Sequence, residues 1–132
     1  MITTIDHIGI AVESLDSAVA FYERTLGLKC DSREEIPSQQ VRVALFQVGE
    51  ARIELIEPSG TESPIHAFLL KHGEGIHHLA FASNDLTGQL VQAREAGCQL
   101  VNESVVTGGA GKAVAFLHPK SAHGVLIELC QG

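Results

Sequence analysis

One eight-residue pattern occurs twice in this sequence, and it constrains the fold more than any other feature. The first copy covers residues 5–12, with the sequence IDHIGIAV, and the second covers residues 76–83, with the sequence IHHLAFAS. Both copies read as short strands with a histidine near the start, His7 in the first and His78 in the second. Such a repeat predicts two similar structural modules in one chain.

The same succession of patterns follows each copy. An amphipathic helix pattern comes first, with apolar residues recurring on one face, and strand-like runs come after it. Gly27 and Gly97 stand where the two helix patterns end, a position that favours a residue with positive φ. The apolar helix positions are Leu15, Val19, Tyr22 and Leu26 in the first half and Leu86, Leu90 and Ala93 in the second; the strand-like runs are 41–46, 52–56, 114–117 and 125–129.

The patterns therefore predict two β-α-β-β-β modules. At 132 residues the chain is long enough for one core but too short for an additional cofactor domain. We expect a single α+β domain, with one short helix between its halves that begins at Ser63-Pro64 and ends at Gly73. The expected parts are a first repeat over about residues 1–60, a linker helix over about 63–73 and a second repeat over about 75–132, all within one domain of residues 1–132.

Each module also carries a glutamate inside its last apolar run. Glu54 and Glu128 both stand between an Ile and a Leu. Because side chains alternate along a strand, each Glu lies on the opposite face from these apolar neighbours and points either to solvent or into a cavity. The alternation alone does not decide between the two.

The two histidines and the two glutamates are two copies of one pair. Taken singly, a strand Glu is usually solvated, and a lone His is more often structural than a ligand. Two imidazoles and two carboxylates at equivalent places are the donors of an octahedral divalent-metal site with two positions open. We therefore expect a metal site made of His7, Glu54, His78 and Glu128. His77 lies on the opposite strand face from its neighbour, and the repeat match selects His78 as the ligand.

Longer segments of the chain resemble the methylmalonyl-CoA epimerase family of the vicinal oxygen chelate superfamily, which also contains glyoxalases, bleomycin resistance proteins and dioxygenases. The resemblance covers nearly the whole sequence. The Gly-Ile-His-His segment at 75–78 and the His-Pro-Lys segment at 118–120 are its most specific parts. The matching segments are residues 6–12, 54–58, 73–78, 116–120 and 124–129.

The resemblance implies a fold, a site and a reaction. The fold would be two paired β-α-β-β-β modules that form a curved mixed sheet around a metal site. Cobalt, or else manganese, nickel or zinc, would be bound by His7, Glu54, His78 and Glu128. The protein would be a homodimer with an acyl-CoA substrate, methylmalonyl-CoA, whose α-carbon is inverted through a metal-stabilised enolate. Glu128 would be one of the two acid-base residues that inversion requires.

One position departs from the family pattern. The chain reads Pro37-Ser38-Gln39-Gln40 where family sequences tend to have a Pro-Glu-Gln-like segment, and a serine does not replace a carboxylate. Glu34 and Glu35 are close to Ser38 in sequence and are candidates for the missing carboxylate. A position at a solvated strand end explains these two residues better than a role in the reaction. The resemblance therefore leaves the second acid-base residue unassigned.

Two other functions remain open. A lactoylglutathione lyase, or glyoxalase, also uses paired His and Glu ligands and a proton shift. A small-molecule-binding protein of the same fold would do no chemistry, although it would often lack an intact ligand set. A dioxygenase fits less well, because a fourth protein ligand occupies a position that its iron needs.

Composition excludes several kinds of partner. The net charge of −7, without any Lys/Arg cluster, disfavours nucleic acids and anionic membranes. Three cysteines without paired spacings, Cys30, Cys98 and Cys130, are typical of reduced thiols. No secretory, transit or membrane-spanning pattern is present. We expect a soluble cytoplasmic protein.

A glycine-rich segment, GGAGK at residues 108–112, superficially resembles a phosphate-binding loop. It lacks the first glycine of that motif, and Ala113 follows Lys112 where Ser or Thr is required. We expect a turn before the strand at 113–117, which by resemblance borders the acyl-CoA site.

Overall fold

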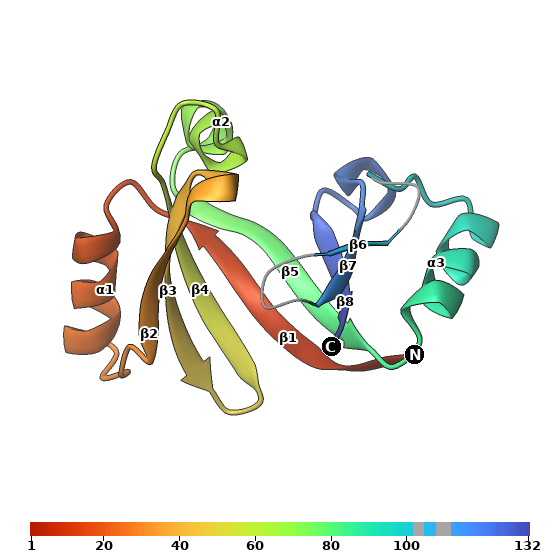
Figure 1. Ribbon diagram of the computed structural model, residues 1–132, viewed down its shortest axis with the longest axis horizontal. Helices are drawn as coiled ribbons and strands as arrows, with labels where there is room; N and C mark the ends of the chain where they lie inside the picture. The colour runs from red at the N-terminus through yellow and green to blue at the C-terminus, as the bar shows by residue number, and fades with distance from the viewer. Residues whose placement is uncertain (102–104, 108–111) are drawn as a thin grey trace. The chain divides into compact units, whose positions relative to one another are not determined.

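The computed structural model describes residues 1–101, 105–107 and 112–132 (Figure 1). The order of its strands and helices is β-α-β-β-β twice, with α2 between the two modules, which confirms the α+β fold class. The first module contains β1 (Ile2–Ala11), α1 (Leu15–Arg24), β2 (Ser32–Ile36), the 3-10 helix η1 (Pro37–Gln39), β3 (Val41–Val48) and β4 (Ala51–Pro58). After α2 (Pro64–His72), the second contains β5 (Gly75–Ser83), α3 (Leu86–Glu95), β6 (Val106–Thr107), β7 (Ala113–Leu117), the 3-10 helix η3 (Pro119–Ser121) and β8 (Ile127–Gln131).

The strands follow the order β2-β3-β4-β1-β5-β8-β7-β6. In both modules the first strand is hydrogen-bonded beside the last one, so the strand with the predicted His ligand lies next to the strand with the predicted Glu ligand. β5 and β8 are parallel, whereas β2, β3 and β4, and likewise β6, β7 and β8, pair antiparallel. The sheet is mixed, as expected.

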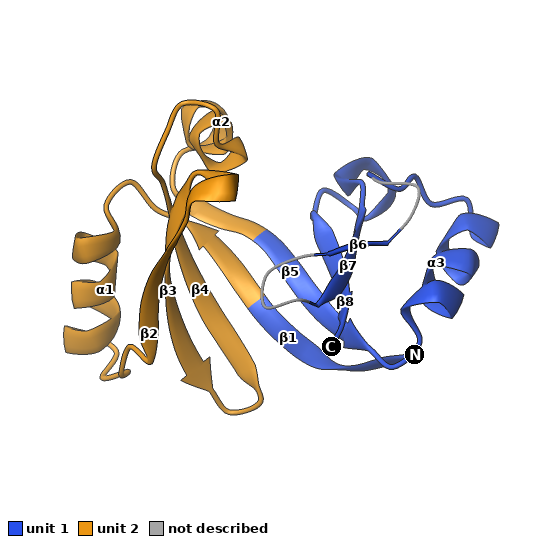
Figure 2. Ribbon diagram, in the orientation of Figure 1, with its two compact units in different colours: residues 1–7, 78–132 blue, residues 8–77 orange. Residues whose placement is uncertain are grey.

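The chain divides into two compact units (Figure 2). Unit 1 contains residues 1–7 and 78–132, and unit 2 contains residues 8–77. The boundary passes through β1 directly after His7 and through β5 directly before His78. Both predicted histidine ligands therefore belong to unit 1.

Unit 2 has an apolar core on which α1 and α2 pack. Helix α1 buries Leu15 and Val19 against Phe46 and Leu55, two residues that are fully buried. Ser14 begins this helix by accepting a hydrogen bond from the Ser17 N–H. In the same way α2 packs on a second cluster, whose buried members are Ala11, Val41, Val43, Ile56, Ile65 and Leu69.

The predicted helix face was one turn too long. Leu26 does not belong to it, because α1 ends at Arg24 and the Leu26 side chain is exposed. Gly27 follows with φ of 71°, and Gly97 takes φ of 84° after α3, as the sequence predicts.

Unit 1 has a smaller core under α3. Leu86 and Leu90 of this helix contact Ala115 of β7 and Leu129 of β8. Asp85 begins the helix by accepting a hydrogen bond from the Gly88 N–H. Because side chains alternate along β8, Leu129 faces α3 and its neighbour on the strand faces the other side of the sheet.

The last strand begins later than its apolar pattern suggests. Val125 and Leu126 precede β8 instead of belonging to it, since Gly124 has φ of 87° and the Val125 N–H donates to the Ala122 carbonyl. Residues 108–111 of the glycine-rich segment lie outside the described residues. Among the helices of the described ranges, none combines the length and the apolar character needed to cross a bilayer.

Candidate active site

Three of the four predicted ligands meet in unit 1. His7 comes from β1, His78 from β5 and Glu128 from β8. The Nε2 atoms of His7 and His78 lie 3.0 Å apart. One carboxylate oxygen of Glu128, Oε1, lies 3.6 Å from the His7 Nε2 and 3.5 Å from the His78 Nε2.

The strand pairing explains how these side chains converge. Ala80 pairs directly with Glu128 in the parallel β5-β8 ladder, so these two residues share a face of the sheet. His78 stands two residues before Ala80 and lies on the same face. On the opposite face, Leu129 packs against α3. Because Leu129 packs in the apolar core, its neighbour Glu128 points to the face of the sheet that carries His78.

The three side chains are largely withdrawn from water. His7, His78 and Glu128 are exposed to 8%, 7% and 8%. Polar groups at this depth need partners, because burial without hydrogen bonds or charges to match them costs free energy. Their mutual distances place two imidazole nitrogens and one carboxylate oxygen in one buried cluster.

The spacing of these donors fits a divalent metal ion. A triangle with sides of 3.0, 3.6 and 3.5 Å has its centre about 2 Å from each corner, close to the metal–ligand distances of about 2.0–2.2 Å for imidazole and carboxylate. Two His and one Glu are also the donor types that such ions accept. His7, His78 and Glu128 can therefore hold a metal in unit 1.

Glu54 belongs to unit 2. It lies in the middle of β4, directly opposite Leu45 of β3. Its neighbours Ile53 and Leu55 both pack in the core under α1, so Glu54 points to the other face of the strand. The side chain is half-buried. This position matches that of Glu128 in the second module.

His77 has different surroundings from His78. Its ring meets Phe68 of α2 edge-on, with the centroids 5.0 Å apart. Burial lowers the pKa of His77. In unit 2 this histidine therefore packs against an aromatic ring of α2.

An acidic residue beside the site had not been expected. Asp6 Oδ2 lies 2.7 Å from His7 Nδ1, and Asp6 Oδ1 lies 3.1 Å from Lys112 Nζ. The sequence places an aspartate directly before a predicted ligand histidine, which could have signalled a supporting carboxylate. Strand alternation argues against the contact, because neighbouring side chains ordinarily point to opposite faces.

Several other polar residues make contacts within their own segment or are exposed to solvent. The His118 ring accepts a hydrogen bond from the Lys120 N–H at the start of η3. Ser38 lies on the exposed η1 helix, and Glu34 and Glu35 are exposed on β2, as a solvated strand would be. Glu35 stands opposite Arg42 in the β2-β3 pairing.

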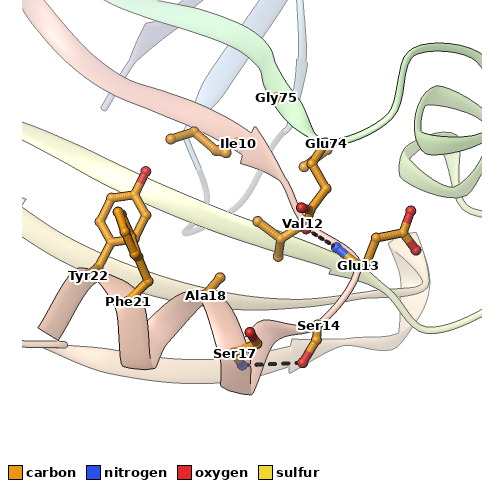
Figure 3. Close-up of a pocket in the computed structure, with 11 residues that line it drawn as sticks. Ile10, Val12, Glu13, Ser14, Ser17, Ala18, Phe21, Tyr22, Glu74 and Gly75 are labelled. Atoms are coloured by element: carbon orange, nitrogen blue, oxygen red, sulfur yellow. Dashed lines mark hydrogen bonds between the residues drawn. The ribbon is translucent and has the colours of Figure 1, made fainter. Parts of the chain in front are cut away.

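Unit 2 also contains a hollow of about 530 Å³ between the end of β1 and α1 (Figure 3). Its apolar wall includes Ile10, Val12, Phe21 and Tyr22. Figure 3 shows Glu74 beside the Glu13 backbone, and the Glu13 N–H donates to its carboxylate. The residues lining this hollow include none of the four predicted ligands.

Fold and site together define the class of protein. The Glyoxalase/Bleomycin resistance protein/Dioxygenase superfamily matches residues 6–116, most of the chain. The chain belongs to this superfamily. The family expectation from the sequence is confirmed.

Individual relatives narrow the class. The uncharacterized protein YqjC of Bacillus subtilis is 46% identical over 127 residues, 96% of this chain and 91% of that protein. The ethylmalonyl-CoA/methylmalonyl-CoA epimerase of Cereibacter sphaeroides is 38% identical over 133 residues, 99% of each. A solved structure of methylmalonyl-CoA epimerase in complex with methylmalonyl-CoA and NH4+ is 36% identical, with a TM-score of 0.91, and covers 100% of this chain and 96% of that one. The chain is thus an enzyme, an isomerase of the epimerase type.

Proposed function

We propose that the protein is a metal-dependent epimerase that inverts the α-carbon of methylmalonyl-CoA through an enolate. The convergence of His7, His78 and Glu128 within 3.6 Å carries this proposal. Support also comes from similarity, at 36% to 38% identity over nearly the whole chain, to proteins named as epimerases of this acyl-CoA.

We propose Glu54 as the fourth ligand. It is the counterpart of Glu128 in the first module and lies on the face of β4 that points away from the core under α1. With His7, His78 and Glu128 it would complete a set of four protein donors for a divalent ion. A divalent ion bound by these residues would supply a Lewis acid to offset the negative charge that develops on the thioester oxygen.

Glu128 is the acid-base residue in this proposal. Its Oε1 faces the two imidazoles, and a carboxylate has a second oxygen that can accept the α-proton of the substrate and return it. The side chain is buried, which keeps water from competing for the proton. Return of a proton to the opposite face of the carbon requires a second donor, which Ser38 does not provide.

The remaining expectations about the protein are part of the same proposal. Cobalt is the expected metal, although His and carboxylate donors also accept manganese, nickel and zinc. A homodimer in the cytoplasm is the expected assembly and location, and none of the three cysteines forms a disulfide in the described part of the chain. Metal analysis and sedimentation equilibrium of the purified protein test the first two points.

The decisive experiment follows one epimer of methylmalonyl-CoA by proton NMR in deuterated water with cobalt-loaded protein. We expect the α-proton signal to disappear and the other epimer to appear, both above a protein-free control. Glu128→Gln should slow both changes by about 10²–10⁴-fold. Glu50→Gln, in the exposed turn between β3 and β4, is the matched control and should keep them.

The same samples separate the alternatives. Turnover of the hemithioacetal of methylglyoxal and glutathione, without epimerisation, would identify a glyoxalase. Absence of both reactions in protein that binds cobalt would overturn the enzymatic proposal and leave a binding protein.

A further inference from the structure

The carboxylate of Asp6 has a specific position next to the ligand cluster of unit 1. Its two oxygens have different partners: Oδ2 lies 2.7 Å from His7 Nδ1, and Oδ1 lies 3.1 Å from Lys112 Nζ. The Asp6 side chain is 14% exposed and that of His7 is 10% exposed, whereas Lys112 is 30% exposed. The contact to the imidazole is therefore screened little by water, and Lys112 lies at the solvent side of the pair.

These distances determine the roles of the two ring nitrogens of His7. An ionised carboxylate only accepts hydrogen bonds, so the hydrogen of the short contact belongs to Nδ1. A neutral imidazole has one N–H, which leaves the lone pair on Nε2. That nitrogen is the one that faces His78 and Glu128.

We propose that Asp6 is a positioning residue that holds His7 in the Nδ1–H tautomer and aims its Nε2 lone pair into the ligand cluster. Lys112 holds the second oxygen of Asp6 and balances its charge. The inference about the tautomer stands on the geometry alone. Its consequence for metal affinity rests on the proposed function.

The two modules differ at this position, which makes the role specific to His7. The repeat that matches His7 with His78 matches Asp6 with His77. A histidine cannot supply an anionic acceptor beside its neighbour, and His77 packs edge-on against Phe68. The first-module histidine therefore has an anionic support that the second-module histidine does not have from the equivalent position.

Lys112 links two distant parts of unit 1 through this carboxylate. It stands directly before β7, 106 positions after Asp6 on β1. Loss of the lysine should let the Asp6 side chain rotate and weaken the contact with His7. Loss of Asp6 should remove the contact altogether.

The first test is a tautomer measurement on the metal-free full-length protein. Two-bond 1H–15N spectra are recorded at about pH 8.5, well above the ordinary histidine pKa of about 6.5, and His7→Gln assigns the signals. We expect Nδ1–H for His7 in the wild type and a change to mainly Nε2–H in Asp6→Leu. Asp6→Asn retains an oxygen acceptor and should keep part of the Nδ1–H form. An Nε2–H or doubly protonated His7 in the wild type would overturn the proposal without any variant.

The second test is calorimetric titration with cobalt alone. Asp6→Leu should weaken binding by about 10–100-fold, the range typical of lost outer partners of a metal ligand, with a smaller loss in Asp6→Asn and in Lys112→Gln. Asp16→Asn, which removes the exposed ion pair with Arg33 in unit 2, is the matched control and should bind like the wild type. Unchanged tautomer and unchanged affinity in Asp6→Leu would refute the role of Asp6. Failure of the wild type to bind cobalt would instead refute the metal-dependent function. The tautomer measurement would then still decide whether Asp6 positions His7.

Discussion

The Nε2 atoms of His7 and His78 face each other at 3.0 Å, and their rings stand at 89° to one another. Two imidazole lone pairs at this distance repel unless a hydrogen or a cation lies between them. Because Asp6 directs the His7 lone pair toward His78, a hydrogen between the rings must belong to His78. Binding of a metal by both rings then requires the His78 hydrogen to leave Nε2.

Removal of His78 should therefore eliminate high-affinity metal binding. We expect cobalt affinity of His78→Ala to fall by more than the roughly 10–100-fold that loss of an outer partner costs, because a donor atom itself is lost. Calorimetric titration with cobalt measures the change. His72→Ala, on the exposed end of α2, is the control and should bind normally. Equal affinities in the two variants would exclude His78 as a ligand.

Substitution of Glu128 should separate acid-base chemistry from folding. In Glu128→Gln the amide occupies the same space but cannot accept the α-proton, so exchange of that proton should slow by about 10²–10⁴-fold. Deuterium uptake into the substrate measures this rate. The thermal unfolding midpoint is recorded on the same samples, and a large drop in it would mean that the lost activity reflects damage to the fold.

The neighbouring residue on β8 should behave in the opposite way. Leu129 is 3% exposed and packs under α3, on the other face of the strand. Leu129→Ala should lower the free energy of unfolding by about 2–5 kcal/mol, because it removes buried methyl groups and leaves a cavity. Denaturant unfolding measures the loss. Exchange activity per folded molecule should remain close to that of the wild type. A loss as large as in Glu128→Gln would contradict the view that Leu129 serves the core and Glu128 serves the site.

Tyr22 should make stability sensitive to alkaline pH. Burial raises the pKa of Tyr22, the one tyrosine of the sequence, and its ring packs near Phe46 with centroids 5.6 Å apart. The folded state thus holds this proton more tightly than the unfolded chain. Its contribution is fully present below the unfolded pKa of about 10 and is lost as pH rises through the folded pKa. Urea unfolding of wild type and Tyr22→Phe between pH 8 and 11 should show a steeper decline for the wild type, and parallel curves would contradict the shift.

The repeat in the sequence predicts the two modules well because hydrophobic periodicity is a local property of the chain. The order of elements follows from it, while Ser63-Pro64 and the glycines indicate the linker helix and the turns after α1 and α3. The edges of elements are less predictable. Val125 and Leu126 are apolar like the strand that follows them, but the turn at Gly124 removes them from β8.

The site shows the same limit. Alternation leaves open whether Glu128 points to water or inward, and its exposure of 8% beside His7 and His78 decides it. The contact between Asp6 and His7 runs against ideal alternation, and the contact between Asp6 and Lys112 joins residues 106 positions apart. The first contact has only the adjacency of the two residues as a sequence signal, and the second has none, because it depends on where the strands meet.

Ser38 yields a prediction about the balance between proton exchange and inversion. In the proposed function Glu128 is one acid-base group, while family sequences tend to have a Glu where this chain has Ser38 on η1. A single protein base returns the proton mainly to the face from which it came. We therefore expect the wild-type protein to exchange the α-proton with deuterium faster than it inverts the carbon. Ser38→Glu should bring the two rates closer together, and Gln39→Glu, one residue further along, should not. Equal rates of exchange and inversion in the wild type would mean that another group of this chain already serves as the second acid.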